Sequence, residues 1–282
     1  MNLFETTLKI NGFPIAAAKR KLDEIQQINE EDFGEYILNT RSEIVDYHLK
    51  NNPFYKNFVG KTDISNWENI PIMKKSDLQR PLNERLSKGF TEKNVYVNKT
   101  SGSSGTPFIF AKDKFCHGLT WAVILDRFGN LGIDFNSSLQ ARFYGIPLDF
   151  KGYFKERTKD FFSHRYRFPV FDLSEKKLEK ILKVFKMKKF QYINGYTSSI
   201  VLFAKFLAEK NIVLNEICPT LNYCIVTSEM LFDDDRILME KVFGVPVINE
   251  YGASELDLIA FTNNENLFVA NSETLFLEIL DE

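Results

Sequence analysis

The chain is short of cysteine, of histidine and of long apolar runs, and each shortage argues against a class of protein. Its 282 residues include only three cysteines, Cys116, Cys218 and Cys224, an odd number without a C-x-x-C pair. Reduced thiols rather than a disulfide framework are therefore expected. The three histidines are scattered without metal-ligand spacing, which argues against a zinc site. No apolar run approaches the roughly 18 residues of a membrane helix, and the N-terminus carries no signal-peptide pattern, so we expect a cytoplasmic protein without membrane insertion.

An excess of charge of either sign is lacking as well. Thirty-six basic and 38 acidic residues give a formal net charge of −2, so nothing in the composition indicates a nucleic-acid partner or an anionic membrane surface. The lysine-rich stretch 183–189 is interleaved with apolar residues and is interpreted as the solvated face of a helix. The proportions of hydrophobic and charged residues, 44% and 26%, are those of a soluble globular protein, and the 27 phenylalanines predict an aromatic-rich core.

What the sequence does contain is an alternation of strand and helix patterns in its second half, after helical segments at 16–28 and 36–49. Short connections between these elements predict an α/β fold, with parallel strands joined by right-handed crossovers. We expect a helical region over residues 1–90, packed on a main α/β domain over residues 91–282. The elements expected in the second half are strands at 191–193, 223–226 and from Pro246, a turn at Asn194-Gly195, and helices from Asp172, around 200–207 and over 233–243. Asp172 and Glu175 have the spacing of a capping box.

Three segments are expected to follow the carboxyl ends of these strands: 194–196, 227–229 and 249–255. In open parallel sheets, ligands bind outside the carboxyl ends of the strands. These segments should therefore gather at one edge of the sheet and line a cleft there.

The segment 100–107 has the sequence Thr-Ser-Gly-Ser-Ser-Gly-Thr-Pro, between strand patterns at 95–97 and 108–110. Its glycines permit a close approach of the backbone to a ligand, and successive amides with neighbouring hydroxyls can hold an anion such as the phosphates of a nucleotide. It is not a Walker A loop, because no Gly-Lys-Ser/Thr ends it. Composition alone would favour a flexible linker or a hairpin turn, but the flanking strand patterns argue against a free linker.

The segment 251–255, Tyr-Gly-Ala-Ser-Glu, offers an aromatic face, a glycine, a hydroxyl and a carboxylate. These groups can stack on a base, approach a phosphate and hold Mg²⁺. Taken alone, a turn at a strand end with a solvated glutamate is the more common explanation.

Together the two segments resemble the phosphate loop and the Tyr-Gly-x-Thr-Glu motif of the adenylate-forming superfamily of acyl-CoA synthetases, with Ser254 in the Thr position. The segments 52–55, 70–78, 194–196 and 228–229 resemble the branch that contains phenylacetate-CoA ligases and the related capsular-polysaccharide biosynthesis proteins. The resemblance runs from about Tyr36 to the end of the chain.

The resemblance implies ATP-dependent activation of a small carboxylic acid through an acyl-adenylate, followed by transfer to CoA, with Mg²⁺ bound to the nucleotide. Ser254, reaching the α-phosphate, and Glu255, the Mg²⁺ ligand, would be catalytic. The acyl group would contact Tyr144, Gly145 and Tyr196. The residues implied for ATP or AMP are Thr100, Ser101, Gly102, Ser103, Ser104, Gly105 and Thr106 at the phosphates, and Ser228, Glu229, Asn249, Tyr251, Gly252 and Ala253 around the adenine.

The sequence also departs from this family. Residues 274–282 alternate like a strand, and the ribose-binding aspartate, the hinge and the C-terminal lid domain that follow this strand in relatives are not present. We therefore expect an incomplete enzyme. Two alternatives stay open at this point: a non-catalytic nucleotide- or acyl-binding protein in capsular polysaccharide assembly, and acyl loading of a carrier protein. A homodimer is one assembly that the resemblance allows.

Overall fold

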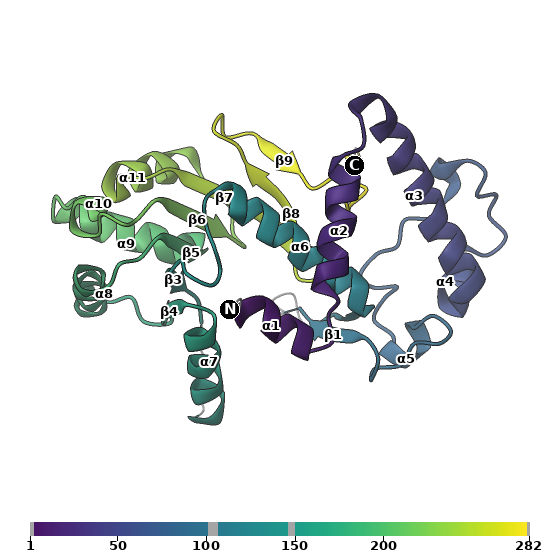
Figure 1. Ribbon diagram of the computed structural model, residues 1–282, viewed down its shortest axis with the longest axis horizontal. Coiled ribbons are helices and arrows are strands. Elements are labelled where there is room, and N and C mark those ends of the chain that lie inside the picture. Colours follow the sequence, from purple (N-terminus) through teal and green to yellow (C-terminus); the bar gives the residue numbers. More distant parts are fainter. Residues whose placement is uncertain (1–2, 101–106, 146–149, 281–282) are drawn as a thin grey trace. The chain divides into compact units, whose positions relative to one another are not determined.

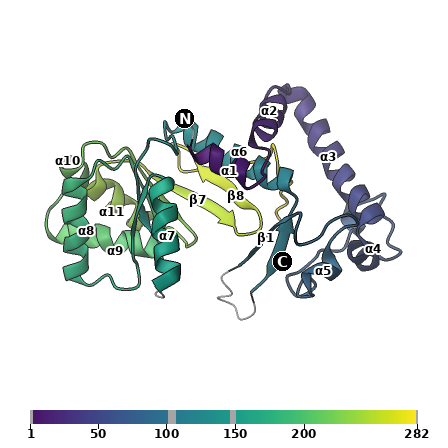
Figure 2. The ribbon, with the colours of Figure 1, turned by 60° about the horizontal axis from the view of Figure 1, so that its bottom comes forward.

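The computed structural model describes residues 3–100, 107–145 and 150–280 (Figures 1 and 2). The chain forms two compact units. The first, here called the sheet unit, comprises residues 1–10, 124–253 and 258–270, and the second, here called the helical unit, comprises residues 11–123, 254–257 and 271–282.

The sheet unit is built on a seven-stranded sheet with the order β4-β3-β5-β6-β7-β8-β9. The pairs β4–β3, β3–β5, β5–β6 and β6–β7 are parallel, whereas β8 and β9 are antiparallel. The predicted α/β fold with a parallel sheet flanked by helices is confirmed. The elements of this unit are α1 (Leu3–Ile10), β3 (Gln140–Phe143), α7 (Phe150–Phe162), β4 (Arg165–Phe168), α8 (Glu175–Met187), β5 (Tyr192–Tyr196), α9 (Thr197–Glu209), α10 (Leu214–Ile217), β6 (Tyr223–Thr227), α11 (Asp233–Phe243), β7 (Val247–Ala253), β8 (Asp257–Thr262), β9 (Phe268–Ala270) and the end of α6 (Lys114–Asn130).

The main hydrophobic core lies between one face of the sheet and the helices α8, α9 and α11, which Figure 2 shows grouped together. Apolar residues that repeat at helical spacing are buried there: Leu178, Ile181, Leu182 and Phe185 on α8, and Ile200, Phe203, Ala204 and Leu207 on α9. The expected aromatic-rich core is confirmed, because Phe168, Phe185 and Phe203 follow one another at ring distances of 5.8 and 5.7 Å. Cys218 and Cys224 are buried free thiols within this core, as expected of small apolar residues.

Two boundaries were predicted wrongly. Asn194 and Gly195 do not form a turn but continue β5, because both pair with β3 and β6. Helix α8 begins at Glu175, with Ser174 as its N-cap, rather than at Asp172. The Asp172 carboxylate instead accepts a hydrogen bond from the Ser174 amide at 3.0 Å, a local turn that precedes the helix.

The helical unit contains most of the chain's first 123 residues. Its elements are α2 (Ile15–Gln26), α3 (Glu30–Asn51), α4 (Pro53–Val59), η1 (Trp67–Asn69), α5 (Leu82–Arg85), β1 (Tyr96–Lys99), β2 (Ile109–Lys112) and the start of α6. The helices predicted at 16–28 and 36–49 correspond to α2 and α3, and the latter begins six residues earlier than expected. No helix of the described part of the chain has the length and apolar character needed to cross a membrane.

The segment after β9 is not the strand that alternation predicted: residues 274–280 form no strand. It lies against α3 and η1 instead. Tyr36 donates a hydrogen bond to the Glu273 carbonyl at 3.1 Å, and Trp67 donates to the Glu278 carboxylate at 2.7 Å. Of the apolar residues in this segment, Phe276 packs on Trp67 with ring centroids 5.3 Å apart, whereas Ile279 and Leu280 are exposed.

One histidine of the helical unit is buried in an aromatic cluster. The His117 ring stacks on Tyr96 at 3.7 Å and lies 4.5 Å from Phe13. Its Nε2 accepts a hydrogen bond from Trp121 at 3.2 Å, while its Nδ1 has no partner among the described residues. Burial lowers the pKa of His117 to about 4, with Lys112 also lowering it and Asp257 opposing.

This burial predicts a loss of stability in mild acid. The unfolded chain binds a proton at this side chain near pH 6.5 and the folded protein only near pH 4, so the free energy of unfolding falls as the pH drops through that window, by about 1–3 kcal/mol. Urea unfolding at pH 7, 5.5 and 4.5 measures the slope. His117→Phe should flatten it, and His164→Asn, which removes a histidine outside this cluster, should not. An unchanged slope in His117→Phe would contradict the assignment.

Candidate functional site

The ends of three adjacent parallel strands bring together the segments that the sequence predicted. Tyr196 at the end of β5 pairs with Thr227 at the end of β6, and Thr227 pairs with Glu250 in β7. The Thr227 hydroxyl, which is buried, donates to the Glu250 carboxylate at 3.0 Å. As predicted, the three segments lie at the carboxyl ends of neighbouring strands, where open α/β sheets bind their ligands.

Two tyrosines predicted to contact an acyl group meet at this edge. The rings of Tyr144, which follows β3, and Tyr196 are 4.5 Å apart. The Arg142 guanidinium lies 4.0 Å from the centre of the Tyr144 ring, within range of a cation–π interaction. Burial raises the pKa of Tyr144 to about 12, with Glu250 and Tyr196 adding to the shift and Arg142 opposing it. The phenol therefore keeps its proton at neutral pH and can donate a hydrogen bond.

The residues that precede the two tyrosines in β3 and β5 form a polar patch on the sheet, which was not predicted from the sequence. Gln140 donates to the Asn194 side chain at 3.3 Å, and Asn194 donates to the Ile225 carbonyl at 3.3 Å. Arg142 donates to Gln140 at 3.4 Å, its Nε has no partner among the described residues, and burial lowers its pKa. The alternation Gln140-x-Arg142-x-Tyr144 was the available signal, because alternate residues of a strand share one face.

A second unpredicted group holds Gly145, the third predicted acyl contact. Arg167, in β4, donates to the Gly145 carbonyl at 2.9 Å and to the Asp160 and Glu156 carboxylates at 3.0 and 2.8 Å. A side chain at Gly145 would meet the ring of Phe171 at 2.8 Å. The backbone that follows Tyr144 is thus fixed by a buried ion-pair network.

Ser228 and Glu229 follow β6 in a tight backbone conformation. Ser228 has a positive φ of 70°, and its side chain hydrogen-bonds with Tyr144. The Glu229 carboxylate accepts from the Ser198 amide at 2.7 Å, and its carbonyl accepts from Thr197 at 3.1 Å. One oxygen of Glu229 thus satisfies the N-terminus of α9, as an acidic side chain there does favourably.

The Tyr-Gly-Ala-Ser-Glu motif spans the end of β7 and the turn that follows. Tyr251 and Gly252 are exposed, and the ring of Tyr251 lies 6.1 Å from Phe268 in an edge-to-face arrangement. Asn249, before them, donates its amide to the Thr262 hydroxyl at 2.9 Å. Ala253 is the last residue of β7, and the turn over 254–256 belongs to the helical unit.

The segment predicted as a phosphate loop follows β1 and precedes β2 in the helical unit. Strands β1 and β2 are antiparallel, the Thr100 amide donates to the Phe108 carbonyl at 2.9 Å, and the Thr100 hydroxyl accepts from the Phe108 amide at 2.9 Å. Ser101, Gly102, Ser103, Ser104, Gly105 and Thr106 lie outside the described residues. Lys112, three residues into β2, forms an ion pair with Asp257, two residues after Glu255. This contact within the helical unit joins the strand that leaves the phosphate loop to the turn that carries Glu255.

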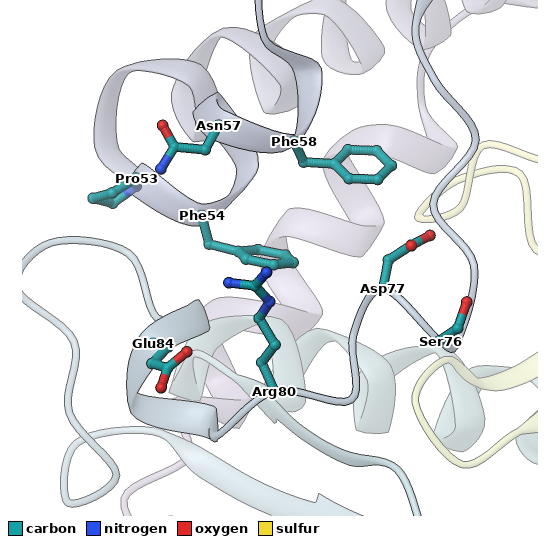
Figure 3. Close-up of a pocket in the computed structure, with 8 residues that line it drawn as sticks. All are labelled: Pro53, Phe54, Asn57, Phe58, Ser76, Asp77, Arg80 and Glu84. Atoms are coloured by element: carbon teal, nitrogen blue, oxygen red, sulfur yellow. The ribbon is translucent and has the colours of Figure 1, made fainter.

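A separate pocket of about 460 Å³ forms in the helical unit where two of the segments that carried the branch resemblance meet. Figure 3 shows Pro53 and Phe54 from the first segment, Ser76 and Asp77 from the second, and the Arg80 guanidinium beside the Phe54 ring. The pocket contains none of the predicted site residues. Acidic and basic side chains both line the pocket, so its charge favours neither an anionic nor a cationic ligand.

Comparison with protein-family models finds no match. Among curated proteins, Protein CapK of Staphylococcus aureus is 26% identical over 258 residues, which cover 84% of this chain and 54% of CapK. Among solved structures, 2-hydroxyisobutyryl-CoA ligase in complex with 2-HIB-AMP and CoA is similar with a TM-score of 0.59 at 14% identity, over 85% of this chain and 53% of the ligase. The open conformation of that ligase matches with a TM-score of 0.57, also at 14% identity, over 83% of this chain and 53% of the ligase.

The chain thus spans about half the length of the relatives it matches. The solved structures establish the fold: the chain has the fold of about half of 2-hydroxyisobutyryl-CoA ligase. At the level of the fold, this agrees with the resemblance to adenylate-forming enzymes found in the sequence.

Proposed function

We propose that this chain is the nucleotide- and acyl-binding part of an enzyme that activates a small carboxylic acid with ATP as an acyl-adenylate. The observation that carries the proposal is the placement of the Tyr251–Glu255 motif. It begins at the carboxyl end of β7, beside the ends of β5 and β6, and its turn is tied by Asp257 to the strand that leaves the phosphate loop. The fold shared with 2-hydroxyisobutyryl-CoA ligase supports it.

The proposed reaction is an in-line displacement. An oxygen of the substrate carboxylate attacks the α-phosphorus of ATP, a new phosphorus–oxygen bond forms, and the bond to pyrophosphate breaks. A thiol, most simply that of CoA, then takes the acyl group and releases AMP. The protein contributes position and charge complementarity rather than a covalent intermediate.

The scheme assigns a role to the residues predicted from the sequence. Tyr251, exposed at the strand end, offers a free ring face for adenine. Tyr144 and Tyr196 would pack against the acyl group, and the protonated Tyr144 hydroxyl keeps a donor available there. Ser254 would reach the α-phosphate, and the amides of residues 101–106 would hold the β- and γ-phosphates.

Magnesium fits the chemistry of this donor set. The half-buried Glu255 carboxylate has no ion pair or hydrogen bond within the described residues, so it is free to bind a cation. No cluster of three or more metal-binding side chains occurs in the described part of the chain, which suits an ion that takes one carboxylate and completes its shell with water and phosphate oxygens. The ion would neutralise charge that develops on the phosphates.

Calorimetric titration of Mg·ATP tests the proposal. Glu255→Gln should weaken Mg·ATP binding by about tenfold or more, while leaving AMP binding without Mg²⁺ unchanged and changing the free energy of unfolding by less than about 0.5 kcal/mol. Glu265→Gln removes an exposed glutamate from the turn between β8 and β9 and serves as the matched control.

Two results would overturn the proposal. Equal Mg·ATP affinity in wild type and Glu255→Gln would remove this carboxylate from the site. Absence of any adenine-nucleotide binding by the wild-type chain would remove the function itself.

A further inference from the structure

Helix α7, at the edge of the sheet unit, presents an aromatic face to solvent. Tyr153, Phe154, Arg157 and Phe161 share this face by their helical spacing. Phe161 and Phe154 are 78% and 63% exposed. The acidic residues of the helix, Glu156 and Asp160, are turned toward β4, where both bind Arg167. The outward face therefore combines exposed rings with Arg157, which donates to the Tyr153 hydroxyl at 3.2 Å, and it lacks the helix's own carboxylates.

A groove of about 320 Å³ runs between this helix and α8, and Figure 1 shows the two helices on either side of β4. Its floor is apolar, formed by residues such as Phe168, Phe171 and Ile181, and Phe171 is 70% exposed. Four cations line it: the buried Arg167 of β4, Arg157 from α7, and Lys177 and Lys180 from α8. Neither lysine forms an ion pair within the described residues. Asp172, also at the groove, accepts a hydrogen bond from the Ser174 amide.

The exposed side of α8 strengthens this positive character. The helix carries lysines at positions 176, 177, 180, 183 and 186 against two glutamates, Glu175 and Glu179, and one of these, Glu175, is paired with Lys210 at 2.7 Å. The chain's net charge of −2 conceals this local excess, because the acidic residues are concentrated elsewhere. A basic amphipathic helix beside protruding aromatic rings is the combination that binds the surface of anionic bilayers.

We propose that the α7–α8 face, defined by Tyr153, Phe154, Arg157, Phe161, Phe171, Lys177 and Lys180, docks on the surface of a membrane that contains anionic lipids. The rings would enter the interfacial layer, the lysines and Arg157 would contact phosphate-bearing headgroups, and the groove would hold a headgroup or a short stretch of acyl chain. This inference is independent of the proposed adenylation activity, and it concerns peripheral binding without insertion of a helix.

Electrostatics favours a membrane over a second copy of the chain as the partner of this face. A two-fold dimer would bring two copies of this positively charged face together, and like charges repel. A small anionic molecule in the groove would not bury the exposed Phe161 ring on α7. A negatively charged bilayer surface can bury the aromatic rings and pair with the cations at the same time.

Co-sedimentation with lipid vesicles tests the proposal. The wild-type chain should partition about tenfold or more better onto vesicles of 3:1 phosphatidylcholine and phosphatidylglycerol than onto pure phosphatidylcholine, and 0.5 M KCl should weaken this binding. Phe154→Ser/Phe161→Ser and Lys177→Glu/Lys180→Glu should each lower partitioning by about tenfold. The matched control is Ile237→Ser/Lys241→Glu, which changes an exposed apolar residue and a lysine on α11 and should bind like wild type.

Circular dichroism and urea unfolding confirm that each variant is folded before the comparison. Equal partitioning of the wild type on the two kinds of vesicle would overturn the proposal, as would face variants that bind like the α11 control. A concentration-dependent dimer that the Phe154→Ser/Phe161→Ser variant abolishes, with no vesicle binding, would assign the face to self-association instead.

Discussion

Replacement of Gly195 by alanine is expected to cost the sheet unit at least about 3 kcal/mol of unfolding free energy, enough to prevent folding of a marginally stable protein. The reason is the close approach of β5 to β3. A Cβ atom at Gly195 would lie 2.3 Å from the Phe143 carbonyl oxygen and 2.6 Å from the Phe143 Cβ. Both strands are central and parallel in register at this point, so neither backbone can move without breaking its ladder. Urea unfolding measures the loss.

The same contact positions the candidate site. Gly195 and Phe143 are paired, and the residues that follow them, Tyr196 and Tyr144, meet with rings 4.5 Å apart. Gly195→Ala should therefore also disturb any ligand affinity that depends on the tyrosine pair. Gly129→Ala, in α6, is the control: nothing lies within 4 Å of the added methyl group, and the better helix propensity should stabilise the protein by up to about 1 kcal/mol. Similar stability of Gly195→Ala and wild type would show that the strands can separate there at little cost.

Gly195 also illustrates what the sequence could and could not predict. Asn-Gly is a common turn dipeptide, and from local chemistry alone a turn was the expected conformation. In the folded chain, Asn194 is instead fixed by hydrogen bonds to Gln140 and to the Ile225 carbonyl, and the glycine is needed for strand contact rather than for a turn. Tertiary packing thus overrode a local signal.

Long periodic segments were predictable because their burial follows from spacing within one element. The apolar residues of α8 and α9 repeat at helical spacing and are buried, and Gly244, with φ at 69°, ends α11 in the left-handed conformation that glycine favours. The end of the chain was not predictable in this way. Residues 274–280 alternate like a strand, but Trp67, which binds Glu278, and Tyr36, which binds the preceding Glu273, lie more than 200 positions earlier in the sequence.

The parts of the candidate site that belong to sequence motifs were predicted. The residues whose role depends on partners from distant parts of the chain were not. The segments 194–196, 227–229 and 249–253 meet at adjacent strand ends because parallel topology requires it. Arg142 and Arg167 belong to no motif. Their importance depends on burial and on partners from other strands and helices, such as Asp160, that are invisible in a single sequence.

Arg167 gives the second large expected effect. Its buried guanidinium donates to Asp160 through Nε and Nη2, at 3.1 and 3.0 Å, to Glu156 at 2.8 Å and to the Gly145 carbonyl at 2.9 Å. Asp160 is 2% exposed and has one other cationic partner, Arg165, at 2.6 Å. Arg167→Met leaves this carboxylate under-compensated in the interior, and removal of one partner from a buried pair typically costs about 3–5 kcal/mol.

A double-mutant cycle separates the charge from the packing. Asp160→Asn alone should destabilise, but Arg167→Met/Asp160→Asn should cost less than the sum of the single changes, because the double variant buries neither charge alone. Lys159→Met is the control: its ion pair with Glu156, at 2.7 Å, is half-exposed, and its loss should change stability by less than about 1 kcal/mol. The released Gly145 carbonyl should in addition loosen the backbone after Tyr144, so Arg167→Met at temperatures where it stays folded should bind an acyl-adenylate analogue more weakly than Lys159→Met does. Additive costs in the cycle, or equal analogue affinity in the two variants, would mean that this network stabilises the edge of the sheet without positioning the site.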